Sequence, residues 1–188
     1  MNASQARQRI SITHVLLTAF ARSLFATPQA NRVWCDVQVE EFQTVDIGLA
    51  VDPERGLVAP LLRDVGAAPL DSIAAGAKRL VERAKNGELN DHGCTRRRNH
   101  SVQCWHASSQ ISYSLINPGQ AAILGVGSVQ HVFRPRPGGE PVPRQEIGLV
   151  LACDHRTWHG VAAAAFLSRV ADNLARPLVL IRPIIGSE

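Results

Sequence analysis

An apolar strand that leads through a short polar turn into an apolar helix constrains the fold of this chain most. Residues 147–153 (IGLVLAC) end at the turn 154–160 (DHRTWHG), and VAAAAFLSRV follows at once. A short apolar run of this kind is typical of a strand, and the run after it has the length of a helix. His155 therefore lies between an acid and an arginine at the end of a strand, where an imidazole is well placed for chemistry.

Further periodic segments predict a sheet covered by helices. Apolar residues at three- and four-residue spacing predict helices, and shorter apolar or alternating runs predict strands. The predicted helices are 10–25, 69–84 and 161–175, with Gly87 as a helix stop, and the predicted strands are 31–39, 45–51, 56–62, 111–115, 121–126, 147–153 and 178–181, with a loop or hairpin tip in 130–142. Strands and helices mix without strict alternation, which favours an α/β fold with a mixed sheet.

Composition restricts the class of protein. The 188 residues are enough for one domain with a full core. No apolar run approaches the roughly 18 residues of a membrane helix, and the amphipathic start does not resemble a signal peptide. The cysteines Cys35, Cys94, Cys104 and Cys153 form no CxxC pair. We therefore expect reduced thiols, a cytoplasmic location and no membrane.

The positive charge is mild and clustered. The formal net charge is +4, and Arg96, Arg97 and Arg98 are adjacent. A basic cluster can mark a nucleic-acid interface. Because no nucleic-acid motif accompanies this one, we interpret it as a solvated loop and expect no nucleic-acid partner.

Four segments, in order, resemble one family. VDIGLAVDPERGLVAPLLRDV is similar to VxIGVAVxTPxGLVVPVxRDAD, and LVERAKNGELND to the helix end before GGTFTISNLG. SLINPGQAAILGVGSV is similar to AIINPPQAAILAVG, and DHRTWHG to DHRxxDG. Together they resemble the catalytic domain of the 2-oxo acid dehydrogenase (dihydrolipoamide) acyltransferases.

The resemblance implies an architecture and partners. It implies a fold like chloramphenicol acetyltransferase, in homotrimers or higher assemblies with each active site between two subunits. The family domain has a further N-terminal helix and strand, so we expect residues 1–188 to be one partial, N-terminally truncated catalytic domain. CoA is the implied cosubstrate, and another chain is expected to supply the lipoyl group.

The resemblance also assigns roles to residues. Acyl transfer between CoA and dihydrolipoamide is thiol attack on a thioester, which needs a base because a free thiol is mostly protonated near neutrality. His155 stands at the position of that base, and histidine suits the task. His159 stands at the family's Asp position, and Val102 at the position of the Ser or Thr that donates to the oxyanion.

Two other readings of the histidines stay open. His155 is also consistent with a capping or buried histidine at a strand end. His155 and His159 would share a face and could bind a metal if they were helical. Because no glutamate completes an HExxH pattern and Gly160 opposes a helix here, we expect no metal.

Residues 92–110 depart from the family pattern. HGCTRRRNHSVQCWHASSQ is nearly free of aliphatic residues and does not predict a strand, although the family has a buried strand there. A zinc site at His92, Cys94, Cys104 and His106 matches no standard spacing. If the codons that encode this segment are read in a frame shifted by one base, they permit the sequence GG-x-I-T-L-S-N-V-G-M. At Trp105 the shifted codon can encode only Gly. We therefore interpret this segment as an out-of-frame translation, through a sequencing error or compensating insertions and deletions.

These inferences lead to one main function and two alternatives. The chain is predicted to be a CoA-dependent acyltransferase, impaired as written because Val102 and His159 deviate. The first alternative is a catalytically inactive relative that serves as a scaffold or interaction subunit. The second is a metal-binding module.

Overall fold

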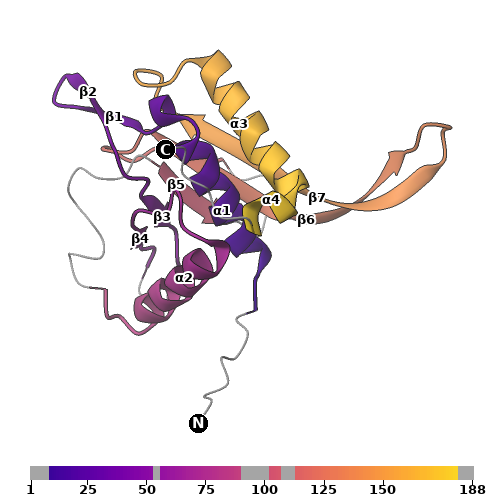
Figure 1. The fold of residues 1–188 in the computed structure, drawn as a ribbon, viewed down its shortest axis with the longest axis horizontal. Helices are drawn as coiled ribbons and strands as arrows, with labels where there is room; N and C mark the ends of the chain where they lie inside the picture. The colour runs from indigo at the N-terminus through magenta and orange to yellow at the C-terminus, as the bar shows by residue number, and fades with distance from the viewer. Residues whose placement is uncertain (1–8, 53–55, 90–101, 107–112, 182–188) are drawn as a thin grey trace, which may run out of the picture.

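The computed structural model describes residues 9–52, 56–89, 102–106 and 113–181. Within them, four α-helices, a short 3-10 helix and seven strands follow one another along the chain (Figure 1). Their bounds are α1 Ile12–Phe25, η1 Pro28–Ala30, β1 Arg32–Cys35, β2 Gln38–Glu41, β3 Ile47–Leu49, β4 Leu61–Leu62, α2 Leu70–Lys85, β5 Val102–His106, β6 Ala122–Pro135, β7 Pro141–Cys153, α3 Gly160–Ala175 and α4 Pro177–Ile181.

A five-stranded mixed sheet carries the core. Its order is β4-β3-β5-β6-β7. Strands β3, β5 and β6 run parallel, whereas β4 and β7 run antiparallel to their neighbours. The separate hairpin β1–β2 forms a two-stranded sheet of its own. The predicted α/β class with a mixed sheet is confirmed.

Helix α1 lies between α2 and α3 and is the centre of the helical layer (Figure 1). Its side chains Leu17, Phe20 and Leu24 are fully buried. The ring of Phe20 meets the edge of Phe166 from α3 at 5.7 Å between centroids. Such edge-to-face contacts add to the hydrophobic gain from burial, so α1 and α3 are packed as one unit.

Helix α2 packs closely on the sheet and ends where the sequence predicts. A Cβ added at Gly76 would approach Leu62 of β4 to 2.9 Å, so glycine permits the close approach. At the C-terminus, Gly87 has φ +71° and the Glu88 amide donates to the carbonyl of Arg83. A left-handed glycine satisfies the last carbonyls of a helix in this way, which confirms Gly87 as the stop.

Four predicted strands differ from the structure. Of the predicted strand 56–62, only Leu61–Leu62 forms β4, and Val58 makes an isolated bridge with Val51. Residues 31–39 were expected to form one strand, but the chain reverses between β1 and β2 at Asp36 and Val37, whose φ angles are positive. Residues 178–181 lie in the helix α4 instead of a strand. Residues 113–115 are not in a strand, while 111–112 lie outside the described residues.

The anomalous segment does contain a strand. Although its polar sequence predicted none, β5 lies in the middle of the sheet and pairs in parallel with β3 and β6. The strands β3 and β6 both turn backbone N–H and C=O groups toward β5, and buried groups of this kind need hydrogen-bond partners. The rest of the segment, including His92 and Cys94, lies outside the described residues.

Strands β6 and β7 continue beyond the sheet as a long hairpin (Figure 1). The register shifts between Val126 and Val129, and the side chains beyond it are largely exposed. The tip is closed by a hydrogen bond from the Arg136 amide to the carbonyl of Glu140, with Gly138 and Gly139 at positive φ. The hairpin tip predicted within 130–142 is confirmed. Within the described ranges, no helix combines the length and hydropathy needed to cross a membrane.

Candidate functional site

The turn between β7 and α3 is anchored to the sheet by its first residue. The Asp154 amide donates to the carbonyl of Ala121 at 2.8 Å, and the Asp154 carbonyl accepts from the amides of Thr157 and Trp158, both at 3.0 Å. The hydroxyl of Thr157 donates to the same carbonyl. These bonds fix the path of residues 154–158, so the backbone of His155 is held at the end of β7.

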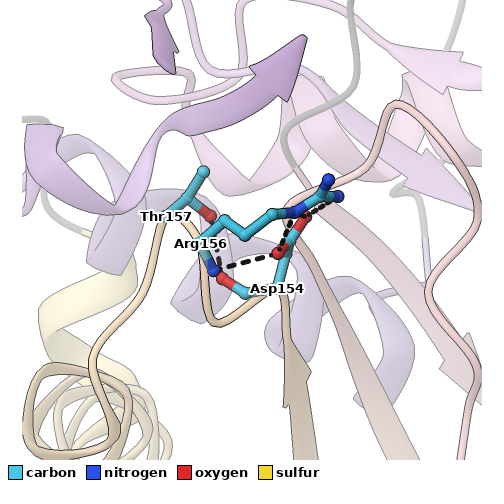
Figure 2. A network of polar contacts seen from close by, with 3 residues as sticks. All are labelled: Asp154, Arg156 and Thr157. Atoms are coloured by element: carbon cyan, nitrogen blue, oxygen red, sulfur yellow. Dashed lines mark hydrogen bonds and ion pairs between the residues drawn. The ribbon is translucent and has the colours of Figure 1, made fainter. Parts of the chain in front are cut away.

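The carboxylate of Asp154 is bound by Arg156 on the other side of His155. The Arg156 Nε donates to Oδ1 at 2.9 Å, Nη2 donates to Oδ2 at 2.6 Å, and the Arg156 amide donates to Oδ1 at 3.0 Å (Figure 2). Hydrogen bonds from this guanidinium hold the pKa of Asp154 below its usual value. These hydrogen bonds join the two residues on either side of His155, and none of them involves the His155 imidazole.

The two histidines of the turn lie close together at the surface. Both are exposed, and their rings are 6.2 Å apart between centroids and nearly perpendicular. His159 is the N-cap residue of α3 and makes no side-chain capping bond. Because α3 begins only at Gly160, the pair is not on one helix, and the metal reading that required helical spacing is wrong. Over the described residues, no cluster of three or more His, Cys, Asp or Glu could hold a metal.

Trp158 fixes the end of the turn to the helical layer. It is only 3% exposed, and its ring meets the edge of Phe166 at 5.1 Å between centroids. The indole Nε1 has no hydrogen-bond partner within the described part of the chain. Trp158 therefore serves as a packing residue between the turn and α3.

Trp34 is a part of the site that the sequence did not reveal. The Arg156 guanidinium carbon lies 5.5 Å from the centroid of the Trp34 ring, in cation–π geometry. Trp34 belongs to β1, more than a hundred residues away along the chain. Local alternation indicates only that Trp34 lies in a strand, so no pattern could have linked it to the turn.

The register of the sheet places Val102 level with Cys153, the last residue of β7. Val102 pairs with Ala122, and Ala122 pairs with Cys153, two residues before His155. Two strand spacings separate Val102 from Cys153, about 10 Å. Burial raises the pKa of Cys153 to about 11, so its thiol stays protonated near neutrality and is no nucleophile for this site.

Comparison with known proteins identifies the family. The family described as 2-oxoacid dehydrogenases acyltransferase (catalytic domain) matches residues 1–182. The chain belongs to this family.

Sequence relatives are acetyltransferase components of pyruvate dehydrogenase complexes. The chain is 30% identical over 185 residues to the mitochondrial dihydrolipoyllysine-residue acetyltransferase component of Dictyostelium discoideum, covering 92% of this chain and 28% of that protein. It is also 30% identical to the corresponding component of Zymomonas mobilis, covering 95% of this chain and 41% of that protein. The chain thus spans well under half the length of these relatives.

Solved structures share the fold. The cubic core of the pyruvate dehydrogenase multienzyme complex matches with a TM-score of 0.79 and 27% identity, covering 95% of this chain and 74% of the other. Azotobacter vinelandii dihydrolipoamide acetyltransferase matches equally well, at 26% identity. A chloramphenicol acetyltransferase matches with a TM-score of 0.50 and 16% identity, covering 87% of this chain and 78% of the other. The predicted resemblance in fold is confirmed.

Proposed function

We propose that this chain transfers an acyl group between CoA and a dihydrolipoyl thiol, with His155 as the general base. The observation that carries the proposal is an exposed imidazole held by a bonded turn at the end of β7, in a member of this family. A histidine and an asparagine four positions apart were investigated for catalytic roles in the Azotobacter vinelandii enzyme. His155 and His159 have the same spacing.

In the proposed reaction His155 takes up one proton and later returns it. His155 takes the proton from the attacking thiol, and the sulfur forms a bond to the thioester carbonyl carbon. The tetrahedral intermediate collapses, the bond to the leaving sulfur breaks, and the imidazolium returns its proton to that sulfur. CoA and the dihydrolipoyl group are the two substrates, and the lipoyl group comes from a partner chain.

The residues at positions 102 and 159 are expected to lower the rate of acyl transfer. A valine at 102 cannot donate a hydrogen bond to the oxyanion, and loss of one such donor costs about a hundredfold to a thousandfold in rate. An imidazole stands at 159, where the resemblance implies an acid and the Azotobacter vinelandii enzyme has an asparagine at the same spacing from a histidine. If residues 92–110 are out of frame, a serine returns at 102. The intact mass of the purified protein and the DNA sequence encoding residues 90–111 test that interpretation.

We further propose that the chain works as a homotrimer or higher assembly, with each site completed by a second copy. Within one chain, β6 lies between β5, which begins at Val102, and β7, which leads to His155. The apolar side chains of Tyr113 and Leu115, in the segment that leads into β6, are 82% and 90% exposed. Such exposure is typical of surfaces that are covered in an assembly.

Turnover of the purified chain tests the function. Acetyl-CoA and free dihydrolipoamide serve as substrates, and the wild type is compared with His155→Ala. The matched control is His131→Ala, which removes an exposed imidazole from the distal hairpin. We expect the wild type and the control to exceed His155→Ala by at least tenfold. Equal background rates in all three would reject the enzyme and favour the inactive scaffold subunit.

A further inference from the structure

The hairpin β1–β2 is placed to act on the turn that carries His155. It forms a sheet separate from the five-stranded sheet, and it lies beside the loop that leads into α3 (Figure 1). Val33 is buried in the core, which anchors β1. Successive side chains of a strand point to opposite faces, so Trp34 faces away from that core position. Its ring meets Arg156.

The contacts form a chain from Trp34 to His155. Arg156 binds Asp154 through its side chain and its amide, and these two residues flank His155. The backbone of the turn is anchored to Ala121 and, through Trp158, to Phe166. The bonds between Arg156 and Asp154 lie within three consecutive residues, so they do not fix the Arg156 guanidinium against the rest of the molecule. The Arg156 side chain is 61% exposed, and ion pairs at such a surface contribute little by themselves. Among the residues that the structure describes, Trp34 is the contact that joins the guanidinium to another element.

We propose that Trp34 is a positioning residue for His155, acting through Arg156 and Asp154. This inference rests on the proposed function, because it assigns the hairpin β1–β2 a part in that reaction. A flat indole surface restricts the plane of the guanidinium, and the guanidinium restricts the Asp154 carboxylate and the turn. Misplacing a catalytic group by about 1 Å can cost a hundredfold in rate, so a partial loosening lowers kcat by about tenfold.

Kinetics of three variants separate positioning from folding. Trp34→Ala removes the ring, and Trp34→Phe keeps an aromatic face. The matched control is Val39→Ala, since Val39 is the cross-strand partner of Trp34 and its truncation perturbs the same hairpin without removing the Trp34 ring. We expect Trp34→Ala to lower kcat about tenfold with KM little changed, Trp34→Phe to recover most of the loss, and Val39→Ala to stay within about twofold of the wild type.

Combining Trp34→Ala with Arg156→Met tests whether Trp34 affects His155 through Arg156. Arg156→Met keeps an extended side chain but removes both the charge and the bonds to Asp154. If Trp34 acts through Arg156, Trp34→Ala has no further effect on kcat in this background. An unchanged tenfold effect there overturns the proposal, and so does a loss of kcat in Val39→Ala equal to that in Trp34→Ala.

Hydrogen exchange gives a readout that does not depend on activity. The Arg156 amide donates to the Asp154 carboxylate, so its exchange rate reports how firmly the turn is closed. We expect Trp34→Ala to speed this exchange severalfold and Trp34→Phe to restore it. An inactive wild type rejects the proposed function alone, whereas exchange that is unchanged in Trp34→Ala rejects the positioning role.

Discussion

At the scale of single residues, the turn 154–160 combines a rigid backbone with an exposed pair of imidazoles. Asp154 anchors the turn to the carbonyl of Ala121, and Trp158 anchors it to Phe166. Between these two fixed points lies His155, and just after them lies His159 at the N-cap of α3. His159 therefore affects the start of α3 as well as the surface next to His155.

Replacing His159 by the family's acid is expected to stabilise the protein. His159 makes no capping bond, whereas an aspartate at the N-cap accepts from the first amides of the helix and favours its positive end. We expect His159→Asp to raise the free energy of unfolding by about 1 kcal/mol, measured by urea denaturation. His159→Ala is the control, and equal stability of the two variants would contradict a capping role.

Restoring a hydroxyl at position 102 is expected to raise turnover. Val102→Ser supplies a donor for the oxyanion, and Val102→Ala removes the same bulk without a donor. We expect kcat of the serine variant to exceed that of the alanine variant by about tenfold or more. Steady-state rates at saturating acetyl-CoA measure the difference. Equal rates would mean that no oxyanion forms near this position.

At the scale of elements, α1 begins with a titratable cap. The Ser11 amide donates to Nδ1 of His14, and the His14 amide donates to the Ser11 hydroxyl. This reciprocal pair is a capping box in which histidine takes the place usually held by Glu or Gln. Because Nδ1 must accept a hydrogen bond, the cap requires a neutral imidazole.

The stability of α1 is therefore expected to depend on pH. Burial lowers the pKa of His14 below 6.5 in the folded protein. As pH falls below about 6.5, the unfolded chain binds the proton first, so stability is complete above that pH and declines below it. His14→Gln keeps the capping box without titrating. We expect its Tm to fall less than that of the wild type between pH 8 and pH 5.5, and parallel curves would disprove the effect.

The element scale also shows where local patterns fail. The helices α1, α2 and α3 match their predicted ranges closely because periodic apolar residues mark the face that is buried. The reversal at Asp36 and Val37 was missed because valine rarely adopts a positive φ and is no turn signal. Strand β5 is not predicted by its own polar pattern, although the family resemblance implies a strand there, because its pairing with β3 and β6 depends on residues distant in the sequence.

At the scale of the whole molecule, apolar surface remains outside the core. The helix α4 exposes Leu178, Val179 and Ile181, and Leu178 is 75% exposed. A short helix with three exposed aliphatic side chains is unfavourable in a monomer. Together with Tyr113 and Leu115, it supports the proposed assembly.

Disrupting α4 is therefore expected to reduce the size of the assembly. Leu178→Glu places a charge on the exposed apolar face, and Ser72→Glu places the same charge at an exposed position of α2 as a control. We expect multi-angle light scattering to give a smaller mass for Leu178→Glu and the wild-type mass for the control. A monomeric wild type would reject the assembly, and equal masses would remove α4 from its interface.

The sequence by itself determined the helices α1, α2 and α3, the mixed α/β class and the polar turn with His155, because periodicity and turn chemistry are encoded locally. The boundary of one domain at 1–188 and the cytoplasmic location stay predictions. Only the tertiary structure decided that Trp34 meets Arg156 and that Val102 lies level with Cys153 across β6. These relations depend on strand register and on the packing of distant segments, which arise from the sum of many contacts rather than from any local pattern.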